Sequence, residues 1–462
     1  MIKKFIKLMT SRREFLKQSS LIAAGTLIAP KVFSLNLSSK PAVVILGAGF
    51  SGLAAGMKLK ENGFDVTILE ARKRIGGRVF SHNIPDGSND DLVIELGAEW
   101  IGGSHERIKG LCNEFSLEME DNRFKDRLIY KGKFYDPESW DWSPDWKVQF
   151  EKILADYKNL TEQEKIVLDK MDWWRFLMNH DIPEKDLDIR EYADSTDFGE
   201  SIRFVSAYSA LAEYAESNEY NEMDFKVKGG NKRIAEGMAE KIGMENILLE
   251  HKATEIDSSG KVKIKCSNGK VFTCDKLICT VPTFAMSKII FTPVLSPEKI
   301  EAINALQYSR IIKSATIFKE RFWKDESFSI LTDTYTHYFY HATKNQKSPK
   351  GVLITYAVGD KADILSKMVK EERIKVIIET LKTAMGDVSG YVEDNLNYYW
   401  GDDEYSKGAY ALYGKGQWFG IMPALRENTE NIYFAGEHVA DWQGFMEGAL
   451  NSGEDAAEKI MS

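Results

Sequence analysis

Short apolar runs and longer amphipathic stretches alternate along this chain. Residues 43–46 (Val-Val-Ile-Leu) form an unbroken apolar run, which is typical of a parallel strand buried on both faces. Residues 65–69 and 351–358 predict two further strands, the second of them buried. Residues 146–220 carry helix formers at helical spacing, whereas residues 247–281 alternate between strand patterns and turns. These patterns predict an α/β fold.

A tight hairpin is expected within the strand-rich stretch, because Asn268-Gly269 is typical of a two-residue turn. That register places Cys266 opposite Val271, so Cys266 does not face Cys274 and we expect no disulfide between them. The spacing of the chain's four cysteines fits no metal site, and no histidine is near enough in sequence to complete one. We therefore interpret all four as buried thiols and expect no metal ion.

The N-terminal residues 1–35 predict an export signal rather than a part of the fold. A basic start leads into Ser-Arg-Arg-Glu-Phe-Leu-Lys, whose paired arginines resemble a twin-arginine signal. The apolar run at residues 21–30 is far shorter than the ~20 residues of a spanning helix. We expect export through the Tat translocon of a bacterium, a periplasmic or secreted location, and no stable membrane span in the mature chain. A basic, disordered arm is the alternative, and cleavage or retention of the signal is left open.

Size and charge narrow the class of protein. The remaining ~425 residues exceed a single core and suggest about two domains. Hydrophobic content of 43% with 28% charged residues is that of an ordinary soluble globular protein. The net charge of −9 argues against nucleic acid as a partner, because binding it requires a basic face.

A glycine-rich turn follows the first strand, and it reads Gly47-Ala48-Gly49-Phe50-Ser51-Gly52. Gly47 permits the tight turn, and Gly49 lets the backbone approach a pyrophosphate. Gly52 lets the following helix pack closely on the strand, with its N-terminus toward the phosphates. The second strand delivers Glu70 about 20 residues on, where a carboxylate binds ribose hydroxyls. This unit fits FAD or NAD.

Two further segments favour FAD. The first is Glu70-Ala71-Arg72-Lys73-Arg74-Ile75-Gly76-Gly77-Arg78. Its arginines and glycine pair would give the phosphates and the flavin edge both charge and close backbone contact. The second lies near the C-terminus and contains Gly436-Glu437 and Gly444-Phe445-Met446. A fold that binds only a nicotinamide cofactor does not need this second segment.

From about residue 42 to 457 the chain resembles the flavin-containing amine oxidase family, which includes monoamine, polyamine and L-amino-acid oxidases. The matching motifs, in the family's order, are LEARKRIGGRV, ELGAEWIGG, VKGGNKRI, ICTVP, Tyr399-Trp400 before EYSKGAY, FAGEH and GFMEGALNSGEDAA. The resemblance implies a Rossmann-like FAD-binding domain assembled from residues 41–100, 226–295 and 405–462. An α+β substrate-binding domain would comprise residues 101–225 and 296–404.

The resemblance also implies roles for single residues. Glu437 matches an acid at the ribityl-pyrophosphate region, and Met446 lies where a helix N-terminus approaches the flavin pyrimidine. Trp400 matches a tryptophan beside the isoalloxazine. Lys313 matches a lysine that reaches flavin N5 through a water, although its own pattern predicts a strand lysine facing solvent. Because Ala409 replaces the cysteine that monoamine oxidases bond to FAD, we expect non-covalent FAD.

Tyr410 and Phe445 match the family's aromatic pair facing the flavin, in a slot that favours a neutral amine by desolvation. The implied reaction moves a hydride from the carbon beside the amine to flavin N5, and the imine then hydrolyses. The electron acceptor is left open between O2, which gives H2O2, and a periplasmic cytochrome or quinone. The positive charge of Lys313 would stabilise the negative charge that develops as O2 is reduced. The other expected cofactor contacts are Gly97, Ala98, Glu99, Trp100 and Ala253.

The substrate class is inferred mainly from Glu99 and Trp100. L-Amino-acid oxidases commonly carry an arginine near this position, whereas Glu99 would repel a carboxylate and could attract a second amine. An L-amino-acid oxidase remains the alternative, because Arg203 or Arg310 could enter the cavity. The aromatic pair disfavours a flavin desaturase, and Lys313 together with the aromatic slot disfavours a flavin-binding protein without turnover. We interpret the five tryptophans between residues 140 and 174 mainly as packing, with a substrate funnel as the alternative.

Overall fold

Two large β-sheets organise the α/β fold of the computed structural model, which describes residues 40–86, 91–216 and 223–462. Residues 41–462 form one compact unit. The export signal expected in residues 1–35 lies outside the described residues. Within the described ranges, no helix combines the length and the apolar character needed to cross a membrane.

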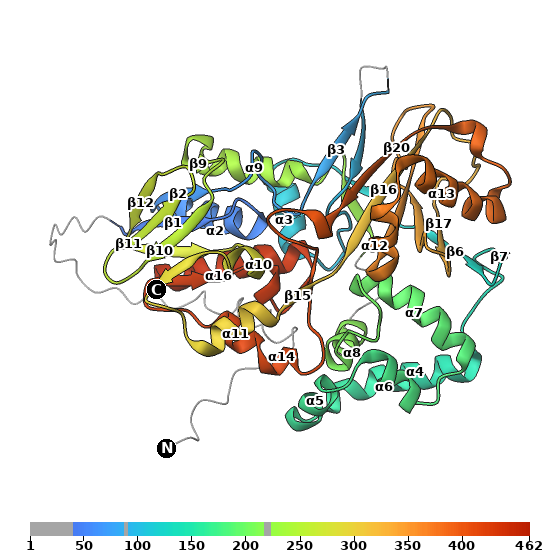
Figure 1. Cartoon of the computed structure of the whole chain (residues 1–462), viewed down its shortest axis with the longest axis horizontal. Coiled ribbons are helices and arrows are strands. Elements are labelled where there is room, and N and C mark those ends of the chain that lie inside the picture. The colour runs from blue at the N-terminus through green and yellow to red at the C-terminus, as the bar shows by residue number, and fades with distance from the viewer. Residues whose placement is uncertain (1–39, 87–90, 217–222) are drawn as a thin grey trace, which may run out of the picture. The chain divides into compact units, whose positions relative to one another are not determined.

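A five-stranded parallel sheet collects strands from distant parts of the chain. Its order is β22 (Ile432–Phe434), β13 (Lys276–Cys279), β1 (Ala42–Leu46), β2 (Asp65–Leu69) and β9 (Ile247–Leu248). The expected strands at residues 43–46 and 65–69 are confirmed. Helices α2 (Phe50–Glu61), α9 (Lys232–Ile242) and α16 (Met446–Met461) share one apolar core with this sheet (Figure 1).

Helices α2 and α16 come close together because small residues face each other. A Cβ atom on Gly453 of α16 would lie 2.0 Å from the carbonyl oxygen of Ser51 in α2. The first and last long helices of the described fold therefore touch backbone to backbone, which sets both of their N-termini beside the same sheet edge.

Three strands of a four-stranded sheet lie in the strand-rich stretch that the sequence predicts, and the fourth follows it. The sheet comprises β12 (Val271–Cys274), β11 (Val262–Cys266), β10 (Ala253–Asp257) and β14 (Ile290–Thr292). The predicted hairpin register is wrong by one residue, because Val271 pairs with Lys265 rather than with Cys266. The turn has three residues, and its Gly269 adopts a φ of +82° that suits a glycine. All four cysteines are buried, free thiols, as expected.

The seven-stranded sheet has one face covered by helices and one face open to a cavity. Its order is β20 (Val392–Tyr399), β16 (Ile311–Phe318), β19 (Gly351–Val358), β18 (Tyr338–His341), β17 (Phe328–Thr332), β6 (Lys125–Tyr130) and β7 (Lys133–Tyr135). The strand predicted over residues 351–358 is β19, and every residue in it is buried. Helices α12 (Gly359–Lys367) and α13 (Lys370–Met385) pack on the side opposite Lys313.

The predicted helical stretch forms a cluster beside the seven-stranded sheet (Figure 1). It contains α4 (Pro144–Asp156), α5 (Glu162–Asp169), α6 (Trp173–Asn179), α7 (Glu184–Phe198) and α8 (Ala207–Glu216). Trp146 and Trp173 are buried in its core, as the packing interpretation expects, whereas Trp140 lines the cavity. The shorter elements are β3 (Ser81–Ile84), β4 (Leu92–Glu95), α3 (Glu106–Glu114), β5 (Met119–Asp121), β8 (Phe225–Val227), α10 (Thr283–Met286), α11 (Pro297–Ala305), β15 (Gln307–Tyr308), β21 (Ala411–Leu412), α14 (Gln417–Gly420) and α15 (Met422–Arg426).

Candidate functional site

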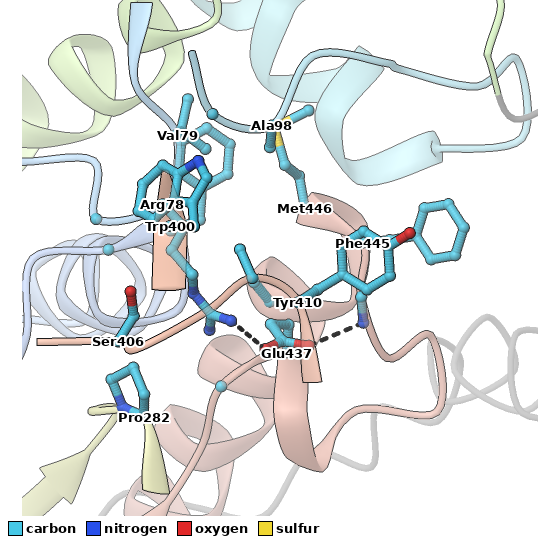
Figure 2. A pocket seen from close by; sticks show the side chains of 18 of the residues that line it. Arg78, Val79, Ala98, Pro282, Trp400, Ser406, Tyr410, Glu437, Phe445 and Met446 are labelled. Carbon is cyan, nitrogen blue, oxygen red and sulfur yellow. Dashed lines mark hydrogen bonds and ion pairs between the residues drawn. The ribbon is translucent and has the colours of Figure 1, made fainter. Parts of the chain in front are cut away.

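A cavity of about 550 Å³ extends from the carboxyl ends of β1 and β2 to the open face of the seven-stranded sheet. Figure 2 shows side chains from several distant segments around this hollow, among them Arg78, Trp400, Tyr410, Glu437 and Met446. Every residue that the sequence analysis predicts for the site lines the cavity except Gly52.

Gly52 lies behind the glycine turn instead. Gly47 adopts a φ of +102°, and a Cβ on Gly52 would lie 1.9 Å from the Gly47 carbonyl oxygen. In front of the turn, Gly77 has a φ of +58°, and a Cβ there would lie 3.2 Å from the Cα of Gly49. Two glycine-rich backbones therefore meet without side chains between them, which leaves room for a diphosphate against the main chain.

Glu70 is held at the end of β2 by the neighbouring backbone. Its carboxylate accepts hydrogen bonds from the amide of Ala48 at 2.7 Å and the amide of Arg72 at 2.8 Å. Burial raises the pKa of Glu70, and these two backbone hydrogen bonds oppose that rise. Since each carboxylate oxygen has more than one acceptor position, Glu70 keeps capacity for ribose hydroxyls.

Both predicted arginines are paired with carboxylates from the C-terminal part of the chain. Arg72 binds both oxygens of Asp403, at 2.8 and 2.6 Å, and Arg78 Nη1 lies 2.6 Å from Glu437 Oε1 (Figure 2). Glu437 also accepts a hydrogen bond from the amide of Gly444 at 2.8 Å. These arginines therefore link an N-terminal segment to the C-terminal part of the chain. They do not present unpaired charge to phosphates. Although burial alone would raise the pKa of Asp403, the Arg72 guanidinium holds it well below its usual range.

Two helix N-termini open into the cavity without a side-chain cap. Helix α2 begins after Gly49, and its residues Phe50 and Ser51 line the cavity. Helix α16 begins at Met446 after Phe445, and both of these residues line it too. The free amides of a helix N-terminus attract negative charge. With the glycine turn and Glu70, this arrangement fits FAD, whose phosphates would meet α2 and whose pyrimidine would meet α16.

Lys313 lies in the buried strand β16, so the pattern-based prediction that it faces solvent is wrong. Its Nζ donates hydrogen bonds to the carbonyl oxygen of Glu95 at 3.1 Å and that of Gly97 at 2.9 Å. It also lies 3.0 Å from Glu99 Oε2. The lysine is thus fixed in the cavity wall by three acceptors from residues 95–99.

The negative charge of Glu99 is balanced by a neighbouring lysine. Its Oε2 accepts hydrogen bonds from Lys313 and from the hydroxyl of Tyr340, which the sequence analysis missed. Its Oε1 is buried and has no partner among residues that the structure describes. Because Lys313 balances the charge of Glu99, this carboxylate attracts a second amine less strongly than the sequence suggested.

Aromatic side chains form much of the remaining wall. The indole of Trp400 donates to the carbonyl oxygen of Leu96 at 2.8 Å, and the ring is buried in the wall. The hydroxyl of Tyr410 donates to the carbonyl oxygen of Asp197, near the end of α7. The Phe445 ring packs edge-on against His105, with 5.6 Å between ring centroids. The predicted pair, Tyr410 and Phe445, both line the cavity (Figure 2).

The arginines that would support an amino-acid substrate lie elsewhere. The Arg203 guanidinium stacks on Trp174 at 4.1 Å, and Arg310 binds Glu200 and two aspartates of α12. Neither lines the cavity. Within the described ranges, the lining arginines are Arg72 and Arg78, and both are ion-paired.

No cysteine lines the cavity among the residues that the structure describes, and Ala409 stands in its wall. The same described ranges contain no group of three or more histidine, cysteine or acidic side chains arranged to hold a metal ion. The glycine turn and the two helix N-termini fit an organic cofactor with a diphosphate.

Comparisons with known proteins agree with this geometry. The family described as flavin containing amine oxidoreductase matches residues 50–461. Amine oxidase [flavin-containing] A of Equus caballus is 28% identical over 477 residues, covering 91% of this chain and 85% of that protein. Amine oxidase [flavin-containing] B of Sus scrofa is 27% identical over 482 residues, covering 92% and 87%.

Solved structures of similar fold include cyclohexylamine oxidase from Brevibacterium oxydans IH-35A. It superposes with a TM-score of 0.81 at 21% identity, and the match covers 91% of this chain and 98% of that chain. A putrescine oxidase bound to putrescine also has a TM-score of 0.81 at 21% identity, with 91% and 99% covered. At these identities the likeness shows the fold alone.

Proposed function

The chain belongs to the flavin-containing amine oxidoreductase family, and on this basis we propose that it oxidises a primary or secondary amine to an imine with non-covalently bound FAD. One observation carries the choice of substrate: the cavity joins the glycine turn to an aromatic slot and places no unpaired arginine in its wall. A carboxylate substrate would find no unpaired arginine there, whereas an amine needs none.

Bound FAD supplies the two-electron acceptor for the carbon next to nitrogen. The protein supplies orientation and exclusion of water. An alkylamine arrives protonated, with a pKa near ~10.4 like that of lysine, and a desolvating slot favours the neutral form that reacts. Tyr410 and Phe445 would orient the amine, and Lys313 would hold a positive charge where O2 is reduced. Ala409 leaves no thiol for a covalent link at this position.

We assign the flavin to residues 41–100, 226–295 and 405–462, and the amine to residues 101–225 and 296–404. The strands of the five-stranded sheet come from the first set, and β16 to β20 come from the second. The cavity lies where the two sets meet.

The flavin of the purified, FAD-loaded protein is expected to bleach with amines under anaerobic conditions and to remain yellow with L-amino acids. Absorbance in the visible flavin band measures this directly. Air is then readmitted, and recovery of the absorbance with formation of H2O2 identifies O2 as the acceptor. Bleaching by amino acids alone would establish the L-amino-acid oxidase alternative, and bleaching by neither panel would contradict both.

We also propose that residues 1–35 direct Tat export to the periplasm or beyond, on the evidence of the paired Arg12 and Arg13. Replacing both arginines with lysine in the full chain should retain the flavoprotein in the bacterial cytoplasm, whereas the unaltered chain should be found in the periplasmic or culture fraction. Fractionation followed by immunoblotting measures the distribution. A cytoplasmic location of the unaltered chain would contradict the proposal.

A further inference from the structure

A carboxylate stands in the cavity wall far from Lys313. Asp126 of β6 accepts hydrogen bonds on Oδ1 from the hydroxyl of Ser329 and, at 3.4 Å, from that of Tyr338. Its Oδ2 has no hydrogen-bond partner in the part of the chain that the structure describes. The side chain is exposed to solvent, and it lines the cavity.

The charge of Asp126 is not balanced by the protein. Over the described residues, no lysine or arginine forms an ion pair with it, unlike Glu99, Asp403 and Glu437, which all have one. Its neighbour Arg127 points to the other face of the strand and binds Asp325 at 3.1 Å. The protein around Asp126 raises its pKa by desolvation, and the two hydroxyls oppose part of that rise.

Aromatic rings stand beside this carboxylate. The indole of Trp140 donates to the backbone carbonyl oxygen of Asp126 at 3.1 Å, which ties the ring to the same position of β6. Tyr338, which donates to the carboxylate, also lines the cavity, as does Trp140. Aromatic faces attract cations, and they do so more strongly where water is partly excluded. An unbalanced carboxylate with two aromatic side chains bonded to the same residue therefore has the composition of a cation site.

The strand register gives the distance to the other end of the cavity. Lys313 pairs with Tyr356 of β19, and Tyr356 pairs with Tyr338 of β18. Strand β17 comes next, and its Ser329 pairs with Asp126 of β6. Four strand spacings of about 4.8 Å separate β16 from β6, or roughly 19 Å of sheet. A compact monoamine held beside Lys313 would not reach Asp126.

We propose that Asp126, Trp140 and Tyr338 form a second cation subsite, which selects a long amine carrying a positive charge at both ends. This assignment of substrate class rests on the proposed amine oxidation at the Lys313 end of the cavity. One ammonium gives up its proton to react, and the other remains charged at Asp126. The subsite thus sets both the length and the charge pattern of the preferred substrate.

Binding is measured first, by calorimetry on the FAD-loaded protein, with a long alkane bearing a trimethylammonium group at each end and with its single-headed analogue. Neither ligand has a nitrogen lone pair, so neither is oxidised. We expect the double-headed ligand to bind about tenfold more tightly to the unaltered protein, and we expect Asp126→Asn to abolish this preference. Asp126→Glu should retain it. Asp136→Asn removes an exposed carboxylate from the nearby hairpin and is the matched control.

Turnover is measured second, with diamines from diaminobutane to diaminododecane and with monoamines of equal length. Asp126→Asn should raise KM for the long diamines about tenfold and leave the monoamines unchanged. Equal binding of the two quaternary ligands by the unaltered protein would overturn the subsite. If instead the double-headed ligand is preferred but no amine bleaches the flavin, the proposed oxidation fails while the cation subsite stands.

Discussion

Lys313→Met is expected to lower the free energy of unfolding by about 3–5 kcal/mol, because it leaves Glu99 buried and uncompensated. It should also slow the reoxidation of the bleached enzyme by O2 on the order of 10²-fold, since a positive charge is removed from the place where negative charge develops. Chemical denaturation measures the first effect, and stopped-flow mixing with oxygenated buffer measures the second.

Two further variants separate the two effects of Lys313. Adding Glu99→Gln to Lys313→Met removes the stranded charge, so stability should recover while reoxidation stays slow. Lys226→Met removes another buried lysine, which donates to the carbonyl oxygen of Ala342 and does not line the cavity. Its reoxidation rate should equal that of the unaltered protein. A normal rate in Lys313→Met would exclude the proposed role in O2 reduction.

Gly52→Ala is expected to purify with less than about a tenth of its FAD and to lose roughly 1–3 kcal/mol of stability through overpacking. The added methyl group would lie 1.9 Å from the Gly47 carbonyl oxygen and 3.2 Å from Thr280 Oγ1. The turn is also held by Thr280, whose Oγ1 donates to the carbonyl oxygen of Leu46 at 2.7 Å. The backbone that faces the diphosphate must therefore move.

Flavin absorbance relative to protein absorbance gives the FAD content, and thermal unfolding gives the stability. Gly260→Ala is the control, because a Cβ at Gly260 meets nothing within 4 Å and its backbone is not in the left-handed region. Full FAD occupancy in Gly52→Ala would show that the turn tolerates displacement and that the close packing is not needed for the cofactor.

The parts of the site that could be predicted from sequence are those decided by local rules. The strand, glycine turn and helix at residues 42–61 are specified by apolar runs and by positions that require glycine, and Glu70 follows at the end of the next strand. The hairpin at Gly269 shows the limit of such rules, since one extra residue in the turn shifts the whole register.

Other parts depend on contacts that no local pattern encodes. Asp403 lies 331 residues from its partner Arg72, and nothing near either residue predicts the pair. The local pattern predicts that Lys313 is an exposed strand lysine. It is buried because β16 lies between β19 and β20 in the sheet. Asp126 and Tyr338 come from strands β6 and β18, which lie beside β17 only once the seven-stranded sheet has formed.

The close contact between α2 and α16 bears on when this protein can acquire its cofactor. Every other element of the described fold precedes α16 along the chain, so a ribosome has synthesised all of them before this helix emerges. The first glycine turn is complete early, but it lacks the N-terminus of α16 and the carboxylate of Glu437 until these later residues have been synthesised. Pairings across such sequence separations also fold slowly. The nascent chain therefore carries only half a flavin site until α16 has emerged, and we expect cofactor binding to follow the synthesis of that helix.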